Sequence, residues 1–175
     1  MGQIKRLKPV KLFAGFIFRQ DYAFKKAMTV LEARFGRCDF ESEPIAFTHT
    51  DYYENEFGKG LTRKFLSFPK LIPPDELSSI KAATNRIEKK LSKDGSRLVN
   101  IDPGYLDLGK AVLATTKDYN HRIYLARGIY AEVTLYYRDK TFTPWDWTYP
   151  DYRTPEYIDT FNKIRSLYAE QIKDL

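Results

Sequence analysis

Apolar and polar positions divide the first part of the chain into segments with distinct periods. Residues 11–18, KLFAGFIF, are apolar and rich in β formers, which is typical of a strand buried on both faces. Residues 21–35 then show helical spacing, with Asp21 as the expected cap and Gly36 as the stop. The apolar stripe of this helix consists of Phe24, Met28, Leu31 and Phe35.

Two more strands and a second helix follow. Residues 44–50 alternate between apolar and polar positions, and residues 61–68, LTRKFLSF, form the next strand. Pro73-Pro74 and the acids after them open a helix that ends before Gly95. Its apolar stripe consists of Leu77, Ile80, Thr84, Ile87 and Leu91. The polar string TNRIE (84–88) is interpreted as a flank of this helix.

The order of these elements predicts the fold class. With a strand at 97–101, the chain reads β-α-β-β-α-β, which is the ferredoxin-like order. Three further strands, near 110–115, 122–126 and 129–138, and a last helix from Pro155 extend it. We therefore predict an α+β fold: a ferredoxin-like unit extended by antiparallel strands and a C-terminal helix, within a single domain spanning residues 1–175.

The last two strands allow a register to be predicted. A two-residue loop would place Ile123 opposite Glu132 and mix apolar and charged faces, whereas a three-residue loop ending at Gly128 separates them. The longer loop pairs Leu125 with Ile129, Tyr124 with Tyr130, Ile123 with Ala131 and Arg122 with Glu132. It places Ile123, Leu125, Ile129, Ala131, Val133 and Leu135 on one face.

Composition places the chain among ordinary globular proteins. Of its 175 residues, 43% are hydrophobic and 30% are charged, and the net charge of +6 permits anionic ligands without demanding nucleic acid. The single cysteine, Cys38, excludes an intramolecular disulfide and favours a cytoplasmic location. No apolar run approaches 18 residues, so we expect no membrane partner.

Sequence motifs for known cofactors are missing. The Gly-Lys pair Gly58-Lys59 lacks the rest of a phosphate loop, and no G-x-G-x-x-G occurs. Two histidines and one cysteine do not build a usual zinc site, so no metal is predicted. The cofactor therefore stays unknown at this stage.

Polar groups capable of chemistry are densest between residues 97 and 134. We predict an anion-binding pocket where the loop 116–121 meets Arg122, beneath the aromatic segment 145–152. Asp102, His121 and Glu132 are the candidate acid–base groups, with Asp102 and Glu132 also suited to magnesium. The ligand-binding candidates are Lys110, Lys117, Arg122, Tyr124, Tyr130, Trp145, Trp147 and Tyr152. Taken alone, Arg122 and Glu132 are better explained as a surface ion pair.

Several strings together resemble a small prokaryotic family known only as a domain of unknown function. Members of that family are sometimes labelled "GTP-binding protein", although no phosphate loop is present here. The resemblance covers nearly the whole chain and implies no established activity. It rests on THTDYY (48–53), LTRKFLSF (61–68), TNRIE (84–88), VNIDPGYL (99–106), VLATTKDYNHRIYL (112–125), GIYAEVTLYY (128–137) and WTYPDYR (147–153).

Three functions stay open on the sequence. The first is binding of a phosphorylated or other anionic small molecule, by a protein that could be an enzyme, with residues 141–153 closing over the ligand. The second is an RNA-binding module without a recognisable motif, in which Tyr124, Tyr130 and Tyr136 stack on bases. The third is a protein-interaction domain that uses the aromatic loop as its interface.

Overall fold

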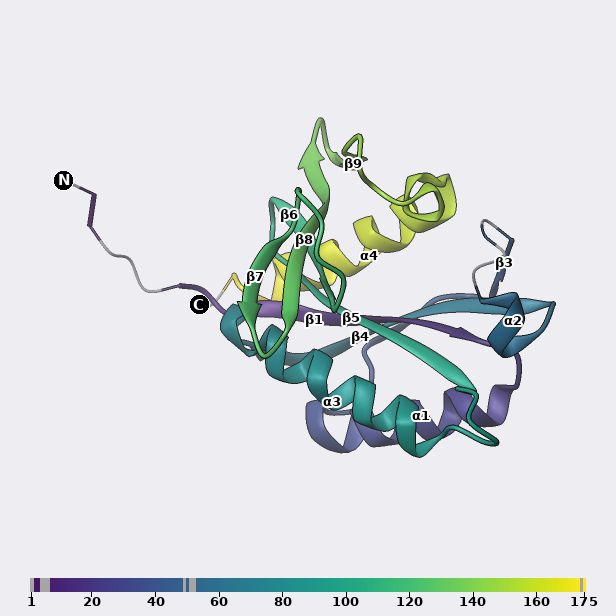
Figure 1. The fold of residues 1–175 in the computed structure, drawn as a ribbon. Helices are drawn as coiled ribbons and strands as arrows, with labels where there is room; N and C mark the ends of the chain where they lie inside the picture. The colour runs from purple at the N-terminus through teal and green to yellow at the C-terminus, as the bar shows by residue number, and fades with distance from the viewer. Residues whose placement is uncertain (1, 4–6, 49, 51–52, 174) are drawn as a thin grey trace.

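One antiparallel sheet runs through the protein. The structure, a computed structural model, describes residues 2–3, 7–48, 50, 53–173 and 175. Within these residues nine strands pair in the order β2-β4-β1-β5-β6-β8-β7, while β3 also pairs with β4 and β9 with β8 (Figure 1).

The elements, in chain order, have the following bounds. They are β1 (Val10–Phe18), α1 (Asp21–Phe35), β2 (Phe40–Glu41), β3 (Ile45–Phe47), α2 (Glu54–Phe57), β4 (Leu61–Ile72), α3 (Leu77–Lys90), β5 (Val99–Leu106), β6 (Lys110–Thr115), β7 (Ile123–Ala126), β8 (Ile129–Arg138), β9 (Thr141–Pro144) and α4 (Pro155–Gln171). Short 3-10 turns at Pro74–Glu76 and Pro150–Arg153 precede α3 and α4.

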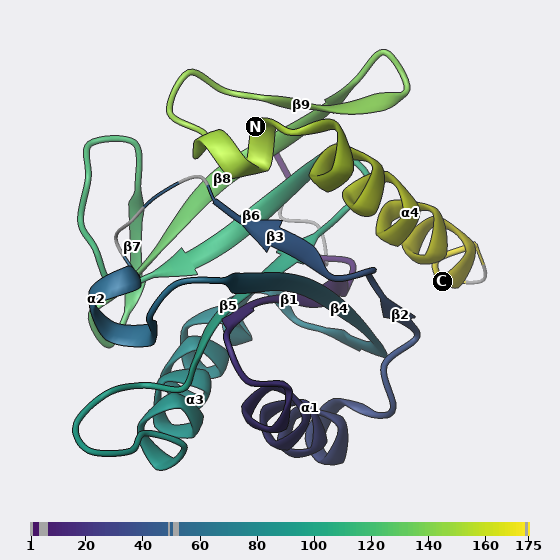
Figure 2. The ribbon, with the colours of Figure 1, turned by 90° about the vertical axis from the view of Figure 1, so that its right-hand side faces the viewer.

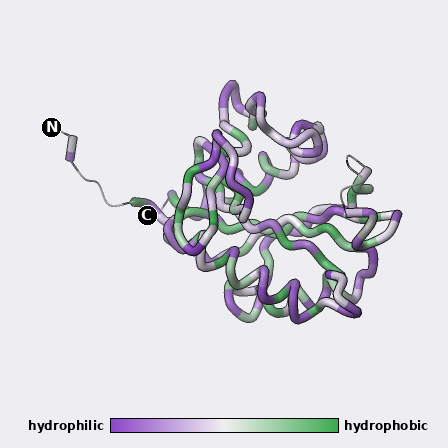
Figure 3. The backbone as a smooth tube through the Cα atoms, in the orientation of Figure 1, coloured by the Kyte–Doolittle hydropathy of each residue, from purple (hydrophilic) through white to green (hydrophobic). Residues whose placement is uncertain are grey.

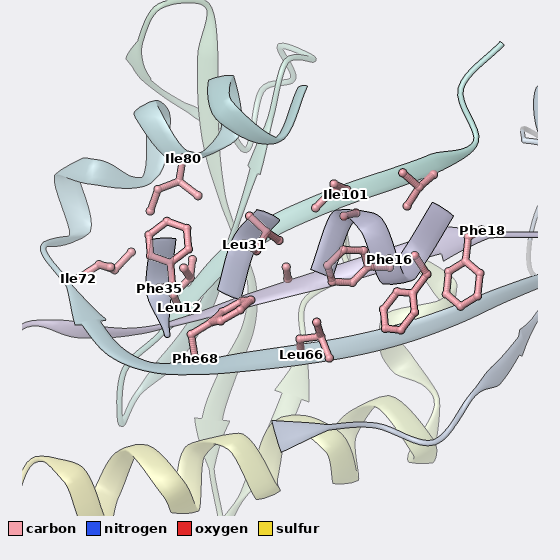
Figure 4. Close-up of a cluster of buried hydrophobic side chains, with 14 of the residues drawn as sticks. Leu12, Phe16, Phe18, Leu31, Phe35, Leu66, Phe68, Ile72, Ile80 and Ile101 are labelled. Carbon is pink, nitrogen blue, oxygen red and sulfur yellow. The ribbon is translucent and has the colours of Figure 1, made fainter. Parts of the chain in front are cut away.

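Helices cover both faces of the sheet. α1 and α3 lie side by side on one face of β4, β1 and β5, and α4 crosses the opposite face (Figures 1 and 2). All nine residues of β1 are buried, as expected for a strand with helices on both sides. The first core lies between the sheet and α1 and α3, where Phe16, Leu31, Phe68 and Ile80 meet (Figure 4).

A second core lies under α4. Tyr157, Phe161 and Ile164 of α4 pack on Phe13 of β1 and Phe65 of β4. The Phe13 and Phe161 rings meet edge to face with centroids 4.9 Å apart, a favourable aromatic geometry. Hydropathy along the backbone follows the same division, since the central strands are largely apolar and the helices alternate between apolar and polar positions (Figure 3).

The α+β class, the large antiparallel sheet and the C-terminal helix are confirmed. The predicted strand at 97–101 lies instead at Val99–Leu106. Gln20, not Asp21, occupies the N-cap of α1, and Asp21 lies in the first turn. β9 was not predicted, because four residues ending in proline show no period. The predicted strand 44–50 is observed as β3, and its position 49 lies outside the described residues.

The β7–β8 hairpin follows the predicted register only in part. Ile123 pairs with Ala131 and Tyr124 with Tyr130, but Ala126, not Leu125, pairs with Ile129. The loop therefore has two residues, Arg127 and Gly128, both with positive φ (58° and 73°), and Leu125 is the extra residue of a bulge. The predicted pairing of Leu125 and the three-residue loop are wrong because a bulge absorbs the odd residue.

A second bulge divides the predicted apolar face of β8. Ala111 pairs with Leu135 and Val112 with Val133, which leaves Thr134 as the extra residue. Leu135 consequently packs in the core under α4, whereas Ile129 packs with Val112 near α3. The prediction that Leu135 and Ile129 share a face is therefore wrong.

Candidate functional site

A cavity of about 690 Å³ lies where the ends of several elements meet, hereafter the central cavity. β4, β5, β6 and β8 contribute strand residues, α3 contributes one helix face, and the segments 115–122 and 149–152 form further walls. Its charged lining residues are Arg63, Lys81, Glu88, Arg97, Asp102, Lys117, Arg122, Glu132 and Asp151. Five cations thus face four acids, an excess of one positive charge when all are ionised.

Arg63 of β4 is deeply buried, with 3% of its side chain exposed. Its guanidinium donates to Asp151 Oδ2 at 3.0 Å, to Asp102 Oδ2 at 3.4 Å and to the Tyr157 hydroxyl at 3.2 Å. It also lies over the Tyr152 ring, 5.7 Å from the centroid. Arg63 therefore joins β4 to β5, to the 149–152 segment and to α4.

Gly15 of β1 makes this arrangement possible. It pairs with Phe65 of β4 on one side and with Asp102 of β5 on the other, and Arg63 lies two residues before Phe65 on β4. A Cβ atom at Gly15 would lie 2.9 Å from Arg63 Nη1. The missing side chain leaves the room through which the guanidinium reaches Asp102.

Asp102 is a carboxylate held by three groups. Oδ2 accepts from Asn100 Nδ2 at 2.8 Å and from Arg63, and Oδ1 lies 3.6 Å from Lys81 Nζ. Lys81 Nζ also donates to the Ile101 carbonyl at 2.8 Å. Burial by itself would raise the pKa of Asp102, but the Lys81 and Arg63 charges outweigh it and hold that pKa below its usual value.

Arg97 extends the same polar network towards α2. Its guanidinium donates to both carboxylate oxygens of Glu56, at 2.8 and 2.7 Å, and to Glu88 Oε2 at 3.1 Å. It also donates to Asn100 Oδ1 at 2.9 Å, which links it to Asp102 through one amide. Burial raises the pKa of Glu88, although the charge of Lys81, the Ile101 N–H and Arg97 oppose this.

The position of Glu88 corrects the interpretation of TNRIE (84–88) as a helix flank. Thr84 and Glu88 are buried, and Glu88 Oε1 accepts from the Ile101 backbone N–H at 2.7 Å. Asn85 and Glu88 line the central cavity. This face of α3 therefore packs on the sheet and carries polar groups into the cavity.

Arg122 and Glu132 form a second charged cluster, and both line the central cavity. Arg122 Nε donates to Glu132 Oε2 at 2.8 Å, and Nη2 donates to the Tyr149 hydroxyl at 2.7 Å. Nη1 donates to the Lys117 carbonyl at 3.0 Å, which fixes the loop before β7. Each charged side chain of the pair is 2% exposed, so the expected surface ion pair is wrong: Tyr149 and the 116–121 loop bury it.

His121 lies beside this pair but does not line the cavity. Its Nε2 is 3.1 Å from Glu132 Oε2, and its ring stacks between Trp147 and Tyr119, with centroids 5.5 and 6.0 Å apart. Trp147 stacks in turn on Trp145 at 5.0 Å, and Trp145 lies 4.3 Å from Tyr136. The tryptophans thus form a partly exposed stack outside the cavity wall.

The predicted site residues separate into two groups. Asp102, Lys117, Arg122, Glu132 and Tyr152 line the central cavity. The remaining candidates lie outside its lining: Lys110, His121, Tyr124, Tyr130, Trp145 and Trp147. Lys110 pairs with Asp107 at 2.8 Å, and Tyr124 packs edge to face on Tyr130.

Sequence reasoning missed five of the nine charged lining residues. The five come from parts of the chain that carry no recognised motif: Arg63, Lys81, Glu88, Arg97 and Asp151. An arginine between the apolar positions of LTRKFLSF was the available signal, because a charge on a buried face needs a partner. No group of three or more His, Cys, Asp or Glu side chains suited to a metal occurs among the described residues.

Comparisons with known proteins give a family and no activity. Residues 8–168 match the family described as a domain of unknown function, DUF4416, so the chain belongs to that family. No curated protein and no solved structure matches the chain. Among the described residues, no helix has the length and apolar character to cross a membrane.

Proposed function

We propose that this member of the DUF4416 family binds a phosphorylated or other anionic small molecule in the central cavity. The observation that carries the proposal is that buried charged side chains from distant segments line one cavity. Burying ions costs several kcal/mol each unless they are well paired, so packing alone does not favour such a cluster. A volume of about 690 Å³ lies within the range of small-molecule sites.

Within the cavity the cations have different roles. Arg63, Arg97 and Arg122 each donate to protein carboxylates, so they hold the acids in place. We assign binding of the ligand's anionic group to Lys81 and Lys117, because a lysine ammonium carries three N–H donors on a flexible side chain. Glu132 and His121 act as positioning residues for Arg122.

Asp102 is the hydrogen-bond acceptor for the ligand in this proposal. It lines the cavity and a quarter of its side chain is exposed, whereas Glu132 is enclosed by Arg122, His121 and Thr134. Its lowered pKa keeps it ionised at neutral pH. An ionised carboxylate can accept a hydrogen bond from a ligand hydroxyl.

The test is a thermal-shift screen of phosphorylated metabolites, with and without magnesium, followed by titration of Lys117→Ala. A ligand above its Kd raises the unfolding midpoint by mass action. Losing one charge-assisted contact should weaken binding by about 1.5–3 kcal/mol. Lys110→Ala is the matched control, since Lys110 pairs with Asp107 outside the cavity lining. Equal affinities of the two variants would remove Lys117 from the site.

The RNA alternative receives less support from the geometry of the rings. Of the tyrosines assigned to base stacking, Tyr124 and Tyr130 pack edge to face on each other with centroids 5.3 Å apart, and Tyr136 lies 4.3 Å from the Trp145 ring. Base stacking needs an open aromatic face. The exposed tryptophan edges, 36% and 40% accessible, suit a protein contact better than a nucleotide base.

The ferredoxin-like assignment also belongs to the proposal. We propose that β1 to β5, with α1 and α3, form a ferredoxin-like unit and that the later strands and α4 extend it into a single domain. The pairing of β5 with β1, of β1 with β4, and of β4 with β2 and β3 supports this. A cytoplasmic location is proposed because Cys38 has no second cysteine to pair with.

A further inference from the structure

The buried hydroxyl group of Tyr152 makes no hydrogen bond within the described residues. The residue is 2% exposed and lines the central cavity. Within the described part of the chain, its hydroxyl is the buried side-chain nitrogen or oxygen atom that has no hydrogen-bond partner. Buried polar groups are nearly always paired, so an unpaired one at a cavity wall points to a ligand.

The hydroxyl of Tyr152 remains protonated at neutral pH. Burial raises its pKa well above the usual value, although the nearby Arg63 charge opposes this. A protonated phenol can donate one hydrogen bond and accept another. Tyr152 can therefore donate to an oxygen of the ligand.

Asp102 supplies the complementary acceptor near Tyr152. Arg63 contacts both residues, through Nη1 to Asp102 and through the face of the Tyr152 ring. Asp102 Oδ2 is occupied by Asn100 and Arg63, while the Lys81 ammonium is 3.6 Å from Oδ1, beyond hydrogen-bond length. Oδ1 therefore retains capacity to accept a hydrogen bond.

We infer that the ligand is a phosphorylated polyol, with hydroxyl groups directed at Tyr152 and Asp102 and its phosphate at Lys81 and Lys117. This inference rests on the proposed function and adds the hydroxyl-bearing part. An alcohol matches the pair because it accepts from Tyr152 and donates to Asp102 at once. The sugar of a free sugar phosphate and the ribose of a nucleotide share this chemistry.

The experiment is calorimetric titration with ribose 5-phosphate, glucose 6-phosphate, AMP and n-butyl phosphate. A site built to bond a hydroxyl discriminates strongly against an analogue that lacks it. At least one hydroxylated probe should bind tenfold or more tightly than n-butyl phosphate. Tighter binding of AMP would assign the polyol to a nucleotide, and tighter binding of a sugar phosphate would assign it to a free sugar.

Tyr152→Phe separates ligand recognition from packing. Removing an unpaired buried hydroxyl should keep or raise the melting temperature. It should also weaken binding of the hydroxylated probe about tenfold. Tyr168→Phe is the control: the Tyr168 hydroxyl donates to the Pro9 carbonyl at 2.8 Å and lies outside the cavity lining. That variant should lower the melting temperature and leave affinity unchanged.

The two proposals fail in different ways. If no phosphorylated probe binds, the assignment of a phosphorylated ligand in the proposed function is wrong, and the inference is wrong with it. If n-butyl phosphate binds as tightly as the hydroxylated probes, or Tyr152→Phe binds them normally, the anion site stands and the polyol assignment is overturned.

Discussion

Replacing Arg63 by methionine tests whether its charge organises the base of the central cavity. Methionine keeps much of the length and apolar volume of the side chain but removes all five N–H donors of the guanidinium, three of which are in use. In the native protein these donors serve Asp102, Asp151 and Tyr157 at 3.4, 3.0 and 3.2 Å. Asp151 has 8% of its side chain exposed, so water cannot replace the lost partner fully.

The expected loss is large because a buried charge is left unpaired. Breaking a buried ion pair by removing one partner typically costs about 3–5 kcal/mol. That is a major part of the stability of an ordinary domain, which lies at about 5–15 kcal/mol. Urea unfolding at neutral pH, followed by circular dichroism, would measure the loss.

The loss should shrink as the pH falls from 7 to 5. In the native protein burial raises the pKa of Asp102, and Lys81 and Arg63 more than offset it, so the carboxylate stabilises the fold above its unfolded pKa. That stability is lost only as the pH falls through the still lower folded pKa. Without Arg63, Asp102 loses one of the two charges that hold its pKa down, so its pKa should rise, and protonation of this carboxylate at lower pH removes an unpaired charge.

Arg138→Met provides the control for a lost arginine. Arg138 lies at the end of β8, and its ion pair with Asp139 is exposed, at 72% and 86% accessibility. Its replacement should leave stability unchanged at both pH values. If Arg63→Met resembles this control, or if its loss does not depend on pH, the role assigned to Arg63 is wrong.

Two further predictions concern the hairpin and the cysteine. Gly128→Val should destabilise the protein by about 1–2 kcal/mol in urea unfolding, because φ at Gly128 is 73° and a β-branched residue resists this region; an unchanged midpoint would contradict the observed turn. Burial and the contact with Glu32 raise the pKa of the Cys38 thiol to about 11. Alkylation by iodoacetamide should therefore be slower than for free cysteine at pH 8, and its rate should increase with pH up to that pKa. Rapid alkylation at pH 8 would contradict this prediction.

The elements that could be predicted are those whose own residues carry a period. β1 is apolar along its length, and α1 and α4 repeat their apolar positions at helical spacing, so local sequence fixes both type and place. The pairing of Tyr124 with Tyr130 also follows from alternation alone. β9 was not predicted because it is a strand through its pairing with β8, and its own sequence has no strand pattern.

The candidate site was predicted where its residues are close in sequence. Lys117 and Arg122 belong to one short segment, and Glu132 faces Arg122 through the hairpin register. The burial of this pair was not predictable, because it depends on Tyr149, which lies 27 residues after Arg122 in the sequence. A local charge pattern therefore located the cavity wall but assigned the pair to the surface.

The opposite wall of the cavity depends on a residue that has no side chain. Arg63 and Asp102 lie on strands that never pair with each other, since β1 runs between them. Their contact needs Gly15 at the crossing point, where a Cβ would come within 2.9 Å of the guanidinium. Nothing in LTRKFLSF or VNIDPGYL alone reveals this, because the relevant feature is an empty position in a third segment. Cross-strand packing thus determines which charges meet, and the ligand chemistry inferred from Tyr152 and Asp102 follows from that packing.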